Sequence, residues 1–285
     1  MTDKTTPWWR GQIPTAVLLL IIAVTLIWAL VAHIGAAPGV APLHATKGIA
    51  LTIVGFFAGL RGGLIGTGGC SVMLPVIHFW MGYPAPIAVG TVLFAVIFTA
   101  ISGGYGHLLR RNLDVQAVAW LGGAGILGVI LGSWLFTLLA SHVKLLGLIL
   151  GLIFLWPAIR MIWEGATAVL AFVVGITTGV AGLGGGYALV PGLIYLFGAP
   201  VHLTMGTSLA TMIPLTLVGG GIKLAQSFVD LPTGLLLAAG TIVGAQVVAA
   251  LIKRFRPATL KLIFGLYFLY VAAKFMTTYF GVMIW

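Results

Sequence analysis

Long apolar stretches follow one another along almost the whole chain, and only short loops separate them. About 20 consecutive apolar residues are enough to cross a bilayer as a helix. The 285 residues are 61% hydrophobic and 6% charged, whereas soluble domains have roughly 25% charged residues. We therefore predict an all-α polytopic membrane protein. The composition excludes a water-soluble enzyme, a disordered chain and a nucleic-acid-binding protein.

Acidic residues are scarce. The chain has 14 Lys and Arg but only four acids, Asp3, Asp114, Glu164 and Asp230, and none of the four lies within an apolar stretch. Cation transporters usually keep carboxylates inside the bilayer, so this interior favours a small anion or a neutral solute. We expect that solute and the lipid bilayer as partners and no cofactor or metal. The oligomeric state stays open, a homo-oligomer included.

The chain contains an internal duplication. When it is shifted by 116 residues, positions 55–114 fall on 171–230 without a gap, and 17 of these 60 positions are identical. Eleven of the 17 are Gly or Pro, which control backbone geometry, whereas chance matches in such a chain would fall on Leu, Val and Ala. We therefore predict two structurally equivalent repeats.

Each repeat has the same order of segments. An apolar segment runs into a glycine cluster. A short apolar piece follows, which is too short to span the bilayer, and three longer stretches come next. Glycine-interrupted short segments at matching places in two halves indicate broken, re-entrant helices at a transporter's binding site. We predict a cytoplasmic N-terminus (1–12), a first transmembrane helix (13–34), repeat 1 (49–165) and repeat 2 (166–285).

Basic loops predict the orientation of the repeats. Arg110 and Arg111 follow the first long stretch of repeat 1, whereas Lys253, Arg254 and Arg256 follow the second long stretch of repeat 2. Cytoplasmic loops carry the excess of Lys and Arg, so both loops are cytoplasmic only if the repeats are inverted. This prediction puts the N-terminus inside and the C-terminus outside.

The two glycine clusters are the candidate substrate site. They read Gly66-Thr67-Gly68-Gly69-Cys70-Ser71 and Gly182-Leu183-Gly184-Gly185-Gly186-Tyr187. A loop at membrane depth must be buried in protein or line a wet cavity, and the start of the following helix offers backbone N–H groups to an anion. We expect both tips to meet near the bilayer centre. The alternative is that the glycines only allow close helix packing.

Two hydroxyl motifs follow the clusters. Gly90-Thr91 and Gly206-Thr207-Ser208 each stand near the start of a long helix, where Thr91, Thr207 and Ser208 could donate hydrogen bonds to an oxyanion. Alternatively, these hydroxyls bond to their own helix turn. Asp114 and Asp230 also match, and each precedes a helix, which is typical of N-caps; a proton relay is the alternative.

Four further polar residues could attract or gate an anion. Arg61 lies in an apolar segment, His107 and Lys223 match at offset 116, and Gln226 lies one turn beyond Lys223. The alternatives are snorkelling to the interface for Arg61 and simple topology markers for the others. Cys70 replaces a glycine of the second cluster and could touch a sulfur-containing substrate, although a lone buried Cys usually behaves as a small hydrophobe.

These residues resemble the TauE/SafE family of sulfite and organosulfonate exporters from about residue 49 to 280. The glycine-rich tip, the Pro that follows it, the Gly-Thr pair and the Asp are all duplicated, and Gly182–Gly186 through Pro191 match best. Thr67 and Cys70 depart from the plain glycine run. The resemblance implies a secondary transporter that exports a small sulfur-containing anion across the cytoplasmic membrane.

Alternating access between inverted halves would move such an anion, bound between the two glycine tips. The first alternative is an uptake permease for a sulfur compound such as thiosulfate that uses Cys70. The second is an intramembrane enzyme or scaffold. No zinc-protease, nucleophile-elbow or Walker motif is present in the sequence, so we do not expect an enzyme.

Overall fold

The computed structural model describes residues 13–109, 112–142, 186–195 and 198–251, together with scattered helical residues in 144–155 and 266–277. Within these ranges the elements are helices and there is no strand. Six of the described helices are long and apolar enough to cross a membrane, so the predicted all-α membrane protein is confirmed. The elements are α1 (Ile13–Val31), α2 (Ala45–Ile65), α3 (Cys70–Pro75), the π-helical turn η2 (Val76–Trp80), α4 (Ala85–Leu109), α5 (Val115–Ala140), α8 (Gly186–Tyr195), α9 (Val201–Ala225) and α10 (Leu231–Leu251).

Glycine and proline residues mark the boundaries of the helices. The short apolar piece after the first glycine cluster is α3 with η2, which is too short to span. Pro75 ends the regular α-helical part of this piece, because proline lacks the N–H that the ladder needs. The third long stretch of repeat 1 (145–163), the first apolar segment of repeat 2 (167–181) and its last long stretch (258–280) lie largely or wholly outside the described residues.

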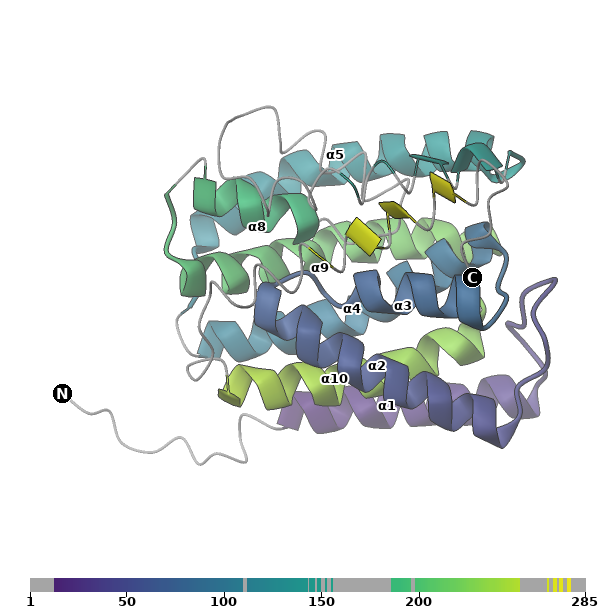
Figure 1. Cartoon of the computed structure of the whole chain (residues 1–285). Helices are drawn as coiled ribbons and strands as arrows, with labels where there is room; N and C mark the ends of the chain where they lie inside the picture. Colours follow the sequence, from purple (N-terminus) through teal and green to yellow (C-terminus); the bar gives the residue numbers. More distant parts are fainter. Residues whose placement is uncertain are drawn as a thin grey trace.

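An antiparallel pair of long helices, α4 and α9, forms the centre of the bundle (Figure 1). A Cβ added at Gly103 would lie 3.0 Å from Leu209, and one at Gly219 would lie 3.0 Å from Leu93. The start of each helix therefore lies beside the end of the other. Nearly all of α4 is buried, so this pair is the core on which the other helices pack.

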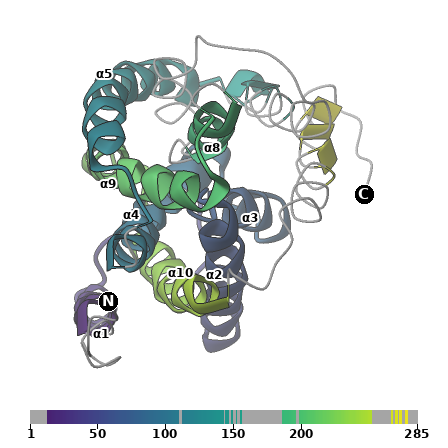
Figure 2. The ribbon, with the colours of Figure 1, turned by 90° about the vertical axis from the view of Figure 1, so that its left-hand side faces the viewer.

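One helix from the opposite half runs parallel to each central helix. α10 lies along α4, where Thr99 donates a hydrogen bond to Thr241 (2.6 Å) and Gln246 donates to Ser102 (3.0 Å). α5 lies along α9, and a Cβ at Gly125 would lie 2.9 Å from Leu215. Figure 2 looks along the bundle and shows α5, α9, α4, α10 and α2 following one another around an arc, with α3 and α8 on its inner side.

Glycines let α2 pack backbone to backbone on α10. Cβ atoms at Gly55 and Gly59 would collide with the backbones of Leu237 and Thr241, and a Cβ at Gly244 would collide with α2. Small residues at this spacing bring membrane helices into close contact, since lipid gives little hydrophobic drive for association. Close helix packing is therefore the role of these glycines.

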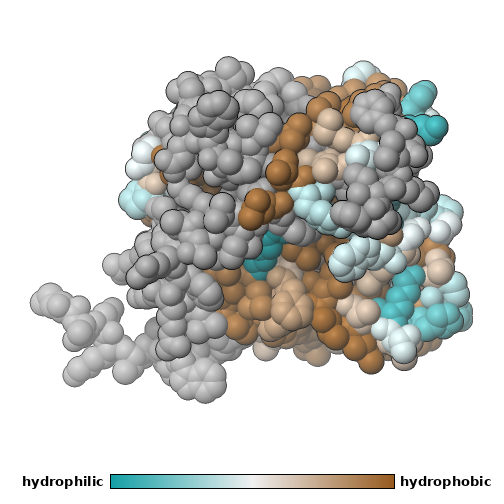
Figure 3. Space-filling view, in the orientation of Figure 1, coloured by the Kyte–Doolittle hydropathy of each residue, from teal (hydrophilic) through white to brown (hydrophobic). Residues whose placement is uncertain are grey.

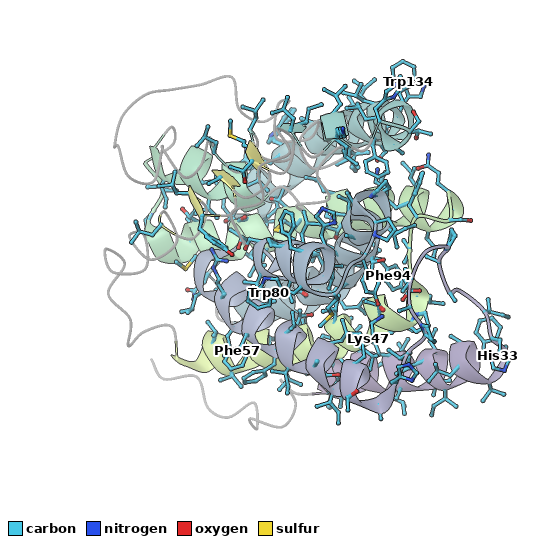
Figure 4. All side chains as sticks on the ribbon, turned by 45° about the vertical axis from the view of Figure 1, so that its right-hand side comes forward. His33, Lys47, Phe57, Trp80, Phe94 and Trp134 are labelled. Carbon is cyan, nitrogen blue, oxygen red and sulfur yellow. The ribbon has the colours of Figure 1, made fainter. Side chains whose placement is uncertain are left out.

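The outer surface is apolar. Large side chains on α1 and α5 are exposed, and the aromatic residues Phe57, Trp80 and Trp134, labelled in Figure 4, lie on the outside of the bundle. Hydrophobic side chains cover the middle of the coloured face in Figure 3, and hydrophilic ones gather towards its right-hand end. An apolar outer surface of this kind is what lipid tails solvate, and it agrees with a multi-pass membrane protein.

Candidate functional site

The first glycine cluster forms a tight, buried tip between α2 and α3. Gly66, Gly68 and Gly69 have φ of 76°, 71° and 80°, a left-handed conformation that glycine adopts without a steric penalty. A Cβ at Gly68 would lie 2.6 Å from Met212 and 2.8 Å from Val96. These two residues lie near the middle of α9 and α4, so the tip reaches the mid-depth of the central pair.

The start of α8 packs directly on this tip. A Cβ at Gly186 would lie 2.5 Å from Thr67 Cα, 2.7 Å from the Gly66 carbonyl oxygen and 3.0 Å from Met212 Sδ. The structure therefore brings the last glycine of the second cluster to the first cluster. Gly184 and Gly185 lie outside the described residues, as does the side chain of Tyr187.

α9 presents buried hydroxyl groups on the side that meets the tip. Ser208 donates a 2.8 Å hydrogen bond to the Gly66 carbonyl oxygen. Thr204 and Thr211 lie about one helical turn to either side of Ser208, and both are fully buried. Among the described residues, neither Thr211 Oγ1 nor Thr67 Oγ1 has a hydrogen-bond partner. Unpaired buried hydroxyls are uncommon, and here two of them belong to segments that meet at one tip.

This hydroxyl face has no counterpart on α4. The positions equivalent to Thr204, Ser208 and Thr211 at offset 116 are Ala88, Val92 and Ala95. Tip side chains show a related asymmetry, since Thr67 and Ser71 stand where the second cluster has Leu183 and Tyr187. The side-chain chemistry of the site thus comes from the first tip and from α9.

Thr91 and Thr207 form equivalent hydrogen bonds between the two halves. Thr91 Oγ1 accepts from the backbone N–H of Asp230, Thr207 Oγ1 accepts from that of Asp114, and both distances are 2.9 Å. A Cβ at the preceding glycines, Gly90 and Gly206, would collide with the opposite half. Each Gly-Thr motif therefore fastens the start of one central helix to the loop after the other. Donation from these hydroxyls to an anion stays a prediction.

Asp114 and Asp230 both take part in helix starts. Asp114 is the N-cap of α5 and accepts from Ala117 N–H at 3.0 Å. Asp230 is buried, and its two carboxylate oxygens accept from Ala37 N–H (3.0 Å) and Thr233 N–H (3.3 Å). The capping interpretation explains the Asp114 carboxylate, while that of Asp230 also anchors the loop that follows α1.

Cys70 and Ser71 are buried in the first turn of α3. The Cys70 thiol donates to the Thr67 carbonyl oxygen at 3.3 Å, within its own loop. This contact stabilises the tip and orients the sulfur along the backbone. The structure therefore places both residues at the predicted tip, and a contact of the Cys70 sulfur with substrate stays a prediction.

The four candidate gating residues lie in three different places. Arg61 is on α2, about one turn before the tip, and His107 is buried in the last turn of α4, where its Cβ would lie 2.9 Å from a Cβ at Gly206. Lys223 is fully buried in the last turn of α9, with Nζ 3.0 Å from the centre of the Phe136 ring. Gln226 donates to Thr137 at 3.1 Å. Lys223 and Gln226 thus share one end of the bundle, far from the tip.

Thr67 and Thr211 are candidate site residues that the sequence analysis does not single out. A signal for Thr211 existed, because residues 204, 207, 208 and 211 are all hydroxyl-bearing and recur at the helical spacing of one face. Thr67 was noted only as a departure from a glycine run. Its position at the tip, in contact with α8, makes Thr67 a candidate ligand, which the sequence alone does not indicate.

The family profile described as sulfite exporter TauE/SafE matches residues 51–275 of the chain. The chain belongs to the TauE/SafE family. It is 27% identical over 214 residues to a probable membrane transporter protein, YdhB, of Bacillus subtilis (strain 168), a match covering 69% of this chain and 87% of the relative. It is 25% identical over 242 residues to the probable membrane transporter protein MJ0441 of Methanocaldococcus jannaschii, covering 74% and 89%. No solved structure matches it significantly.

Proposed function

We propose that this TauE/SafE protein is a secondary transporter that exports a small sulfur-containing anion, such as sulfite or an organosulfonate, across the cytoplasmic membrane. The anion binds where the first glycine tip, the start of α8 and the middle of α9 meet. Backbone N–H groups of the two tips and the hydroxyls of Thr67 and Thr211 are its ligands, while Ser208 holds the Gly66 carbonyl of the tip. The family description and the relatives' description as probable membrane transporters support this proposal.

The observation that carries the proposal is the meeting of the two glycine clusters at a buried place with unused hydroxyl donors. Gly186 contacts Gly66 and Thr67, and the Thr67 and Thr211 hydroxyls have no partner among the described residues. An unpaired hydroxyl inside a membrane protein is destabilising unless a ligand completes its hydrogen bond. An oxyanion with several acceptor oxygens can satisfy hydroxyl and backbone donors together.

Alternating access is the mechanism that the packing supports best. The central helices are antiparallel, and equivalent Gly-Thr contacts fasten each one to the opposite half. Two halves of inverted orientation can rock about a site between them and open it to either side in turn. With the cell interior negative, export releases about 2.3 kcal/mol per charge per 100 mV. Membrane potential alone can therefore drive an anion outward.

Flux into proteoliposomes tests the proposal. Purified protein is reconstituted, and uptake of sulfite, thiosulfate, sulfoacetate and taurine is measured against protein-free vesicles with an imposed potential. We expect at least one of these solutes to move, and Thr67→Val and Thr211→Val to reduce kcat/KM about tenfold each, the value of one hydrogen bond to a charged ligand. Thr216→Val is the matched control, since its hydroxyl bonds to its own helix at Met212. No flux of any anion by folded protein contradicts the proposal.

A further inference from the structure

Lys223 is a buried lysine with no acidic partner in the described part of the chain. Its side chain is 0% exposed, and no described residue accepts a hydrogen bond from Nζ. Of the chain's four acids, Asp114 and Asp230 are engaged by backbone N–H groups, and Asp3 and Glu164 lie outside the described residues. The Phe136 ring, 3.0 Å from Nζ, is the group that contacts the ammonium, and a cation–π contact compensates only part of the lost hydration.

Ser133 on α5 and Gln226 on α9 lie near the level of Lys223 in the contact between these two helices. The two helices are parallel and in a fixed register, with Leu215 beside Gly125 and Gly219 beside Val129, which puts Ser133 level with Lys223. Ser133 is buried, and its hydroxyl has no partner among the described residues.

The Gln226 carboxamide lies one turn beyond Lys223 on α9. Its nitrogen donates to Thr137 on α5, while its oxygen has no partner within the described part of the chain. A buried ammonium, a buried hydroxyl and a carboxamide therefore lie along one seam between α5 and α9. Together they supply the charge and hydrogen bonds that a small oxyanion takes from a protein.

We propose that Lys223, Ser133 and Gln226 form a second anion site at the end of the bundle where α9 finishes. This site takes the same class of ligand as the tip, a small sulfur oxyanion or sulfonate, and it rests on the proposed transport function. Ser208 and Lys223 are 15 residues apart on α9, so the two sites lie about 22 Å apart along the helix axis. In the predicted orientation the second site lies near the external face of the membrane, where the exported anion binds before its release. Phe136 contacts the ammonium when no anion is bound.

Variants of the seam, compared with a control lysine, test the second site. Sulfite flux is measured as KM and kcat for wild type, Lys223→Met, Lys223→Arg and Ser133→Ala. We expect Lys223→Met to raise KM about tenfold with kcat within about twofold, Ser133→Ala to raise it less, and Lys223→Arg to restore it. Lys47→Met, a change at a lysine whose Nζ donates to Ala41, should leave KM unchanged.

Thermal unfolding of the detergent-solubilised variants separates binding from a structural role. Without anion, Lys223→Met should unfold at or above the wild-type temperature, because it removes an uncompensated buried charge. Sodium sulfite should stabilise wild type more than Lys223→Met. An unchanged KM, or a fall in both kcat and unfolding temperature, overturns the second site while leaving the central one intact. If wild type shows neither flux nor stabilisation by sulfite, the second site and the proposed function fall together.

Discussion

Gly68 and Gly82 have almost the same left-handed backbone, with φ of 71° and 72°, but very different surroundings. Replacing either by Ala costs about 1–2 kcal/mol for the conformation alone. At Gly82 nothing lies within 4 Å of the added Cβ, so we expect no further loss. At Gly68 the Cβ would lie 2.6 Å from Met212 Cε and 2.8 Å from Val96 Cγ1, and overpacking adds about 1–3 kcal/mol. The expected losses are therefore about 2–5 kcal/mol for Gly68→Ala and about 1–2 for Gly82→Ala.

The two neighbours of Gly68 should differ in how easily they make room for the added methyl group. Met212 is flexible and can move its terminal methyl group aside, whereas Val96 is stiff at χ1 and is fixed on α4. Combining Gly68→Ala with Val96→Ala should therefore recover more stability, relative to the sum of the single changes, than combining it with Met212→Ala.

The assay is the free energy of unfolding in mixed detergent micelles, followed by circular dichroism. Gly198→Ala is a second control, because Gly198 is the counterpart of Gly82 in repeat 2 and also has open space around it. Equal losses at Gly68 and Gly82 would refute the tight contact of the tip with the middle of α4 and α9. The contact would also be refuted if neither Val96→Ala nor Met212→Ala recovered any of the stability lost in Gly68→Ala.

Three further predictions test the contacts around the site. Thr91→Val leaves the N–H of buried Asp230 unpaired and should lower the unfolding free energy by about 1–3 kcal/mol. Thr207→Val, beside exposed Asp114, should lower it by less than about 1 kcal/mol, because water can replace the hydroxyl. Equal costs would contradict the difference in burial. Asp230→Asn weakens two charge-assisted bonds and should cost about 1–3 kcal/mol in the same assay, but Asp114→Asn should be nearly neutral since Asn is a good N-cap; a reversed order would argue against the anchoring of the loop after α1. Cys70→Ala should keep sulfite flux within about twofold of wild type, because the thiol bonds to the backbone of its own loop, and abolished flux would favour the thiol-dependent uptake alternative.

The helices and the first tip could be predicted because glycine and proline act locally. Three left-handed glycines between Gly66 and Gly69 can only make a sharp turn, and Pro75 interrupts the short helix that follows. Apolar stretches of sufficient length give the spanning helices directly. These features need no knowledge of which helices become neighbours.

The hydrogen-bond partners could not be predicted, because they depend on the register between helices. The sequence indicates that Thr91 binds an anion or bonds to its own helix turn, yet its hydroxyl accepts a hydrogen bond from Asp230 N–H, 139 residues away. The contact of Lys223 with Phe136 likewise follows from the register of α5 on α9. A single sequence shows the period of each helix but not which face meets which partner.

A density map of the protein saturated with sulfite tests the central claim most directly. The account predicts an anion at the first tip, next to the start of α8, in contact with the hydroxyls of Thr67 and Thr211. A map in which the two glycine clusters lie apart, or in which sulfite binds only away from α9, would contradict it.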